Sequence, residues 1–158
     1  LKAEGYTTGD VTGIINKVKY APASPSYINS ADPLYQYARK IKPVDGYEDV
    51  VVHGDEVGFI FRGADGVDSK VSVAEFAQIL RDTPTYNGGD IRLISCGTGA
   101  PNAITAQALA NDLQVTVLAP SSTVYVDWDG NLTVAPTPKD VRNKTNLGEW
   151  SKIKPKRR

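Results

Sequence analysis

The sequence contains one histidine and one cysteine, His53 and Cys96, and each is followed directly by a glycine. Each also ends an apolar run that predicts a buried strand. A thiolate is a strong nucleophile, an imidazole moves protons, and backbone N–H groups bind a developing oxyanion. We therefore predict nucleophilic catalysis with Cys96 as nucleophile and His53 as base. Gly54 and Gly97 would leave the main chain open to the oxyanion.

The elements around these residues are expected to bring the two side chains together. Apolar runs predict adjacent central strands over 50–52, 91–94 and 115–118. A Ser-x-x-Glu capping box at Ser72 predicts the start of a helix over 73–82. Parallel strands joined by such a crossover helix end at the same edge of the sheet, where ligands usually bind. His53 and Cys96 should therefore emerge at that edge, one or two strand spacings apart.

Further local signals complete the expected fold. They predict a helix over 33–41 capped by Asp32, a strand over 57–62, a helix over 102–112 capped by Asn102, and a hairpin of 123–128 with 131–134. The alternation of strands and helices is typical of an α/β fold with a mainly parallel central sheet flanked by helices, followed by a C-terminal β-hairpin.

Composition suggests three regions and limits the function. We expect a connector over 1–30, an α/β catalytic domain over 31–136 and a polar, basic tail over 137–158, with 1–25 and 152–158 peripheral. The chain has no Met, which suggests a processed piece of a larger polypeptide. Equal numbers of basic and acidic residues exclude a bulk attraction to nucleic acid or anionic membrane.

The cysteine and histidine counts restrict metal and disulfide chemistry. One cysteine excludes an internal disulfide and any zinc site of the multi-cysteine kind. We expect neither a metal nor another cofactor. No apolar run approaches the length of a membrane span, so none is expected.

The blocks VVVHG at 50–54 and IRLISCG at 91–97 occur in that order, with the histidine before the cysteine. This pattern resembles the caspase-like cysteine peptidases of clan CD, especially the self-cleaving domains of large bacterial toxins, over about residues 48–134. The resemblance implies a catalytic dyad of His53 and Cys96. The Gln-Ala-Cys-x-Gly signature of caspases is absent, because Ile94 and Ser95 precede Cys96, and no specificity pocket can be assigned.

The layout of the chain resembles the C-terminal effector domains of bacterial polymorphic toxins, such as contact-dependent inhibition, Rhs-type and wall-associated proteins. The resemblance rests on a Met-free chain with a Pro/Ser/Tyr-rich lead-in, a compact α/β body and a basic C-terminal end. Such domains are detachable parts of a longer protein. The resemblance implies secretion as part of a larger protein, action in the cytoplasm of a target cell on a protein or RNA, and neutralisation by a cognate immunity protein.

Two other functions remain open at this stage. One is a toxin ribonuclease in which His53 acts with Asp55, Glu56 or Arg62, although zero net charge counts against it. The other is a non-catalytic delivery or binding module in which Cys96 and His53 are structural. Substituting Cys96 and His53 separates the three, because the peptidase needs both residues, the ribonuclease only His53, and the module neither.

Three weaker patterns have simpler explanations. The segment 97–100 suggests a phosphate loop but lacks the full glycine spacing and a Walker lysine. Asp127, Asp129 and Asn131 could hold a cation, yet a hairpin turn explains them. The basic run 152–158 could contact phosphate, but a frayed charged tail is the commoner meaning.

Overall fold

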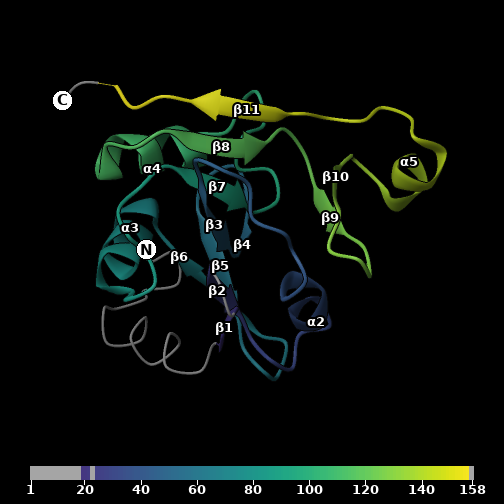
Figure 1. Cartoon of the computed structure of the whole chain (residues 1–158), viewed down its shortest axis with the longest axis horizontal. Coiled ribbons are helices and arrows are strands. Elements are labelled where there is room, and N and C mark those ends of the chain that lie inside the picture. The colour runs from purple at the N-terminus through teal and green to yellow at the C-terminus, as the bar shows by residue number, and fades with distance from the viewer. Residues whose placement is uncertain (1–18, 22–23, 157–158) are drawn as a thin grey trace.

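A six-stranded sheet forms the centre of the molecule in the computed structural model, which describes residues 19–21 and 24–156 (Figure 1). Its strand order is β1-β2-β3-β7-β8-β11. The strands are β1 (Lys19–Ala21), β2 (Ser24–Ile28), β3 (Glu48–Val51), β7 (Ile91–Ile94), β8 (Val117–Pro120) and β11 (Trp150–Ile153). Most of the connector expected over 1–30 lies outside the described residues, but its described part is not a connector, because β2 belongs to the central sheet and Tyr27 and Ile28 are buried.

The inner part of this sheet is parallel. Strand β3 pairs with β2 and β7, and β7 pairs with β8, all in parallel, whereas the outer strands β1 and β11 are antiparallel to their neighbours. The three apolar runs predicted as adjacent central strands are confirmed as β3, β7 and β8, although β8 begins two residues later than expected. The fold class is α/β with a mainly parallel sheet, as predicted.

The chain after β3 forms a small, separate antiparallel sheet. It contains β4 (His53–Gly54), β5 (Phe59–Arg62) and β6 (Asp68–Val71), and the sequence did not suggest the last of these. Helix α3 (Val73–Asp82) follows with the predicted capping box. The Ser72 hydroxyl accepts the Glu75 N–H at 3.2 Å, and the Glu75 carboxylate accepts the Ser72 N–H at 3.3 Å.

Two apolar clusters cover opposite faces of the central sheet, because successive strand residues point to opposite sides. Helices α3 and α4 (Thr105–Leu113) lie on one side, and α2 (Leu34–Ala38) with the hairpin β9 (Val124–Val126) and β10 (Leu132–Val134) lies on the other (Figure 1). The larger cluster contains Val50, Val52, Leu93 and Phe76. The smaller contains Val51 and Ile94 beneath α2 and the hairpin.

Helix α4 begins at Thr105, three residues later than predicted, and Asn102 does not cap it. The residue before the helix, Ile104, offers no side-chain cap. Backbone carbonyls bind the first N–H groups instead, since Ile104 donates to the carbonyl of Glu56 at 2.8 Å and Ala106 to that of Thr98 at 3.1 Å. The turn between β4 and β5 and the loop after β7 therefore take the place of a capping side chain.

The segment expected to be a basic tail contains α5 (Pro138–Asn143) and β11. Lys152 and Ile153 pair with Leu118 and Val117 of β8, so the expectation that they are peripheral is wrong. Residues 157–158 of that tail lie outside the described residues. An edge strand binds through its backbone, which lets the Lys152 side chain stay exposed. In the part of the chain that the structure describes, no helix has the length and apolar character to cross a membrane.

Candidate active site

His53 and Cys96 lie at the carboxyl ends of β3 and β7, which pair in parallel with Val51 opposite Ile94. The Val52 N–H donates to the Ile94 carbonyl at 3.2 Å, so the two chains stay joined up to that point. His53 and Cys96 each follow two residues after this last pair, and both line one pocket. The pocket holds about 330 Å³ of empty space, part of it open to solvent. The sheet thus brings together the two residues expected to react.

Aliphatic side chains form most of the pocket wall. They come from α2 and the segment after it, from the ends of β3 and β7, and from the hairpin: Leu34, Ile41, Val51, Ile94, Val124, Val126 and Leu132. The thiol and the imidazole therefore face an apolar space in which polar interactions are stronger than in water.

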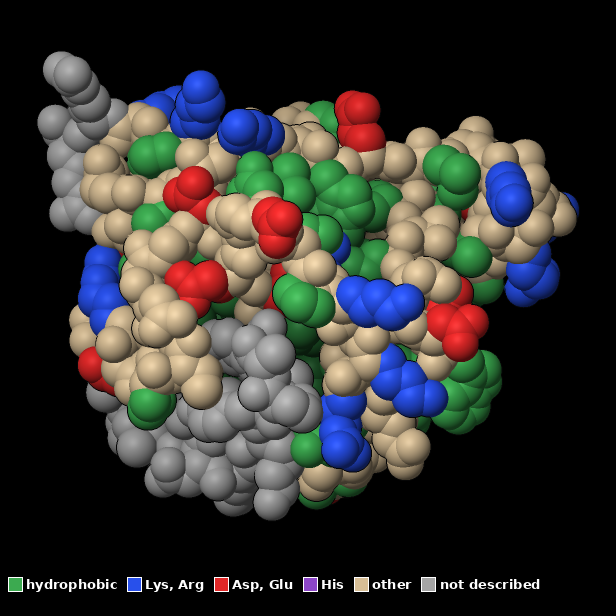
Figure 2. Space-filling view, in the orientation of Figure 1, with side chains coloured by type: hydrophobic (Ala, Val, Ile, Leu, Met, Phe, Trp, Pro, Cys, Tyr) green, Lys and Arg blue, Asp and Glu red, His purple; other side chains and the backbone are tan. Residues whose placement is uncertain are grey.

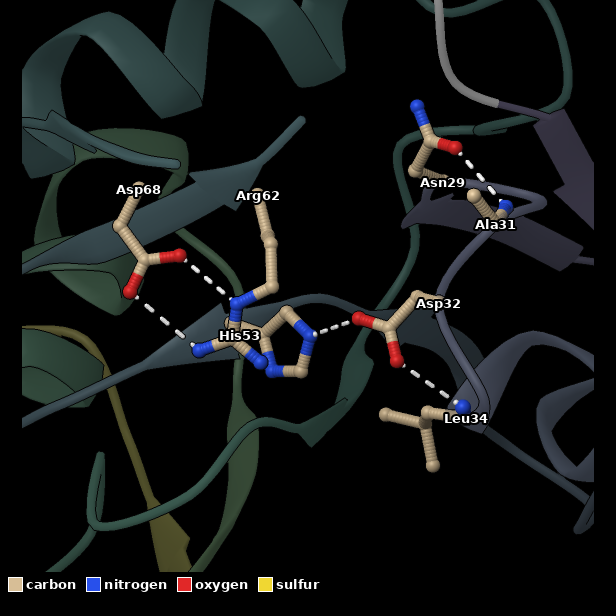
Figure 3. A network of polar contacts seen from close by, with 7 residues as sticks. All are labelled: Asn29, Ala31, Asp32, Leu34, His53, Arg62 and Asp68. Atoms are coloured by element: carbon tan, nitrogen blue, oxygen red, sulfur yellow. Dashed lines mark hydrogen bonds and ion pairs between the residues drawn. The ribbon is translucent and has the colours of Figure 1, made fainter. Parts of the chain in front are cut away.

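Asp32 holds the imidazole of His53, a contact that the sequence did not reveal. Its Oδ2 lies 2.7 Å from Nε2 of His53, and its Oδ1 accepts the N–H of Leu34 at 2.9 Å (Figure 3). The Asp32 side chain is only 7% exposed, against 19% for His53. The residue directly before α2 is Pro33 and the helix ends at Ala38, so the predicted cap and length of this helix are wrong. Oδ1 of Asp32 still accepts the N–H of the first helical residue, and the same carboxylate uses its second oxygen for the histidine.

A second ion pair lies beside this contact. Arg62 donates through Nε to Asp68 at 2.7 Å and through Nη2 at 3.3 Å (Figure 3). His53 pairs with Ile60 of β5, and Arg62 is two residues further along the same face of that strand. Hydrogen bonding to Asp68 raises the pKa of Arg62, and the same bond lowers the pKa of Asp68.

The pKa of Asp32 lies below its ordinary value of 3.8. Burial alone would raise this pKa, but hydrogen bonds from His53 and from the Leu34 N–H outweigh it, and the positive charge of Arg62 acts in the same direction. Asp32 is therefore an anion at neutral pH. A carboxylate can only accept hydrogen bonds, so Nε2 of His53 is the nitrogen that donates to Asp32. In the neutral form of the ring, Nδ1 then carries the lone pair.

The loop after β7 holds Cys96 against the segment that leads into the hairpin. The Gly97 N–H donates to the Ser122 carbonyl and the Gly99 N–H to the Pro120 carbonyl, both at 3.0 Å. The Cys96 thiol lies 3.9 Å from the Val124 carbonyl, a long contact that leaves it able to turn toward another partner. Gly97 has a φ of +70°, which explains the glycine at this position.

These bonds change the expected oxyanion donors. The Gly97 N–H is already bound, so in this geometry it does not serve an oxyanion as predicted. The Cys96 N–H, by contrast, donates to none of the described residues. Asp55 donates to the Gly58 carbonyl, and bonded pairs alternate along an antiparallel ladder, so the N–H of Gly54 points away from β5.

Gly54 also packs tightly against the cysteine loop. A Cβ at this position would collide with the hydroxyl of Ser95 and approach the methyl group of Thr98 to 3.0 Å. Ser95 itself is buried, and its hydroxyl finds no hydrogen-bond partner in the described part of the chain. The glycine after His53 is therefore required for the close approach of the two loops.

The residues predicted for a ribonuclease do not assemble around His53. Asp55 uses Oδ1 to accept the N–H groups of Val57 and Gly58 at 2.9 and 3.0 Å, which closes a turn. Glu56 is exposed. Only Arg62 lies near the histidine, and its guanidinium is occupied by Asp68.

The weaker sequence patterns turn out to be structural. The N–H groups of Gly97, Gly99 and Ala100 all donate to backbone carbonyls, so the loop does not form a phosphate cradle. Asp127 accepts the N–H groups of Asp129 and Asn131 at 2.9 Å and closes the hairpin turn. On the face shown in Figure 2, Lys and Arg side chains lie in several separate groups and form no continuous basic band.

The outer edge of β9 runs beside Cys96 with unused backbone groups. Asp127 donates to Asn131 and Ala135 to Thr123, so these are the bonded pairs of the hairpin ladder. Pairs alternate, and therefore the N–H and C=O groups of Val124 and Val126 point away from β10. Apart from the long contact of the Val124 carbonyl with the Cys96 thiol, they bind no other described residue.

The fold and the site together define an α/β domain whose one thiol and one imidazole share a pocket at the end of a parallel sheet. The chain belongs to the family described as "Domain of unknown function (DUF8616)", which matches residues 23–134. That span runs from β2 to β10 and includes every residue of the site. No curated protein and no solved structure matches the chain.

Proposed function

We propose that the protein is a cysteine hydrolase in which Cys96 attacks an acyl carbon and His53 serves as general base and acid. The observation that carries the proposal is the shared pocket of Cys96 and His53 at the ends of two paired parallel strands. Nucleophile and base commonly lie further apart without substrate than during reaction, so a thiol that now contacts Val124 is compatible with this chemistry.

The steps follow from the atoms present. The thiol proton of Cys96 passes to Nδ1 of His53 while Sγ bonds to the acyl carbon, whose oxygen becomes an oxyanion. Collapse of this intermediate breaks the bond to the leaving nitrogen, which takes the proton from His53. Water then attacks the thioester, His53 removes its proton, and the departing sulfur recovers that proton. The carboxylic acid product is thus released, and the Cys96 thiol and the neutral His53 ring are regenerated.

The N–H of Cys96 and the N–H of Gly54 are the donors best placed for the oxyanion. The first binds none of the described residues, and the second points away from the β5 ladder. Backbone donors of this kind need no reorganisation during reaction, because the surrounding loops already fix them.

A polypeptide is the substrate that the site favours. An extended peptide can add to an exposed strand edge through main-chain hydrogen bonds. The free groups of Val124 and Val126 form such an edge next to the thiol. An RNA substrate would instead require free cations, and the nearest, Arg62, is bound to Asp68.

The biological setting proposed is that of an effector domain released from a larger secreted bacterial toxin, acting in the cytoplasm of a target cell and blocked by an immunity protein. This part of the proposal rests on the likeness of the chain's layout and of its His-Gly and Cys-Gly blocks to such domains. The half-buried position of the reactive pair, in a pocket walled by α2 and the hairpin, is suited to a domain that must stay inert before delivery.

Alkylation tests the reactive pair without knowledge of the substrate, because Cys96 is the sole thiol of the chain. We expect His53→Ala to slow labelling of the folded protein by iodoacetamide about 100-fold at about pH 7, since the base is lost. Arg62→Ala is the matched control, because it removes a neighbouring cation that the mechanism does not use. A Cys96 thiol that reacts only after unfolding would contradict the proposal.

Growth inhibition, proteolysis and RNA cleavage then separate the functional classes. We expect Cys96→Ala and His53→Ala each to abolish growth inhibition and proteolysis when the domain is expressed in bacteria. Loss through His53→Ala alone, with RNA cleavage in the parent protein, would establish the ribonuclease instead. Full inhibition by both variants would identify a binding module.

Proline substitutions test the strand edge. Val126 and Leu132 face each other across the hairpin, both line the pocket, and the N–H of each points outward, on opposite edges. Proline at either site replaces a pocket-lining side chain and removes an outward N–H, but breaks no bond of the hairpin ladder. We expect Val126→Pro to lose more proteolysis than Leu132→Pro. Equal loss would show that β9 does not bind the peptide backbone.

A further inference from the structure

Beyond the dyad itself, we infer that Asp32 is a positioning residue that fixes the tautomer and orientation of the His53 ring, so that Nδ1 is the nitrogen offered to Cys96. The inference rests on the proposed function for its chemical meaning. The contact that carries it is the 2.7 Å bond between Oδ2 of Asp32 and Nε2 of His53. No sequence motif around Asp32 predicts this contact, because 21 residues separate it from His53.

The position of Asp32 is fixed by the chain around it. Its N–H donates to the Asn29 carbonyl at 2.9 Å, and the Asn29 side chain accepts the Ala31 N–H at 2.9 Å, which together close a tight turn (Figure 3). Its Oδ1 then binds the first free N–H of α2, that of Leu34. The carboxylate already accepts one hydrogen bond from Leu34, and two further bonds hold the turn that carries it, so it loses little entropy in orienting the ring.

The charges around His53 also suit an imidazolium that forms during reaction. The charged groups around it are Asp32 from the turn before α2, Arg62 from β5 and Asp68 from β6, and the Cys96 thiol after β7 lines the same pocket. Arg62 and Asp68 neutralise each other, which leaves Asp32 to balance the charge that His53 gains. Asp32 thus favours the transfer of the thiol proton to the ring, since an opposite charge in contact stabilises the protonated form.

Asp32→Asn is the informative substitution. Asparagine caps a helix as well as aspartate does, so the bond to Leu34 and the start of α2 should survive. The amide can, however, turn its NH₂ toward Nε2 and stabilise the opposite tautomer, in which Nδ1 is protonated and cannot take the thiol proton. We expect labelling of Cys96 by iodoacetamide to slow about tenfold, and its rise with pH to move to higher pH.

The tautomer of the His53 ring can be measured directly, and it would not change if the role of Asp32 were purely structural. The chain has one histidine, so ¹⁵N-labelled histidine yields the signals of a single imidazole. We expect a protonated Nε2 and an unprotonated Nδ1 in the parent protein, and a mixed or reversed tautomer in Asp32→Asn. Asp32→Glu should restore the parent tautomer and part of the labelling rate.

Asp68→Asn is the matched control, because it removes a carboxylate of the same cluster that binds Arg62 rather than the histidine. An unchanged tautomer and labelling rate in Asp32→Asn would overturn the inference, and so would an equal effect of Asp68→Asn on both. If His53→Ala leaves the labelling rate unchanged, the proposed hydrolase fails. The tautomer measurement then still decides whether Asp32 orients the ring.

Discussion

Asp49 and Arg92 form a buried ion pair that links β3 to β7, and its removal tests how these strands are held. The two residues are directly opposite each other in the parallel ladder. Arg92 donates to Asp49 at 2.6 and 2.8 Å and to the Lys42 carbonyl at 2.9 Å, and the side chains are 11% and 3% exposed. Each residue stands four positions before His53 or Cys96, so the pair also helps to fix the register that brings them together.

Arg92→Leu leaves the carboxylate of Asp49 buried without a partner. Breaking such a pair from one side costs about 3–5 kcal/mol, because the remaining charge keeps its desolvation penalty. For a domain of this size that corresponds to a fall of roughly 6–20 °C in melting temperature. The double variant Asp49→Leu with Arg92→Leu removes both charges and should regain most of the loss, since apolar residues replace buried pairs at little cost.

Urea unfolding followed by circular dichroism measures both free energies, with equal m-values as the check that the same transition is compared. The double variant also separates stability from register, because labelling of Cys96 reports whether His53 still lies near it. A loss below about 1 kcal/mol for Arg92→Leu would refute the reasoning, since that is the range of an exposed pair. A double variant no more stable than the single one would refute it too.

Three further predictions concern other parts of the fold. Deleting residues 150–158 exposes the edge of β8, so we expect a lower melting temperature by several degrees, whereas a truly peripheral tail would leave the thermal transition unchanged. Ser72→Ala removes the hydroxyl that caps α3 and should cost about 1 kcal/mol in urea unfolding, while a change near zero would show that the Glu75 half of the box suffices. The lowered pKa of Asp32 stabilises the fold fully above 3.8, its ordinary value, and this contribution disappears as the pH falls through the lower folded pKa. On the acid side, the free energy of unfolding should therefore fall less steeply with decreasing pH in Asp32→Asn than in the parent protein. An identical pH dependence of the two proteins would contradict this reasoning.

The central sheet was predictable because its strands are buried on both faces and read as apolar runs. The apolar runs at Val50 and Leu93 are short and bounded by glycines, a pattern that favours buried strands. The capping box at Ser72 was equally clear, since both of its bonds lie within four residues. The predictions that failed concern elements stabilised by hydrogen bonds to backbone groups far away in the sequence. Strand β11 is polar in sequence and pairs with the edge that β8 offers. Helix α4 starts where the carbonyls of Glu56 and Thr98, from two different loops, accept the N–H groups of Ile104 and Ala106.

The same distinction applies to the site. His53 and Cys96 could be paired from sequence because one rule, that parallel strands end at one edge, places both. Asp32 was visible only as a helix cap, since a carboxylate followed by proline predicts its bond to the next turn and says nothing of its second oxygen. The unpaired backbone groups on the edge of β9 could not be predicted from the sequence either. Their direction depends on which alternate residue pairs of the hairpin ladder are hydrogen-bonded. Sequence reasoning therefore misses a group that assists a reaction by orienting another side chain. Asp32 shows why: the sequence predicts the structural hydrogen bond of its first oxygen, whereas only the fold determines which residue its second oxygen binds.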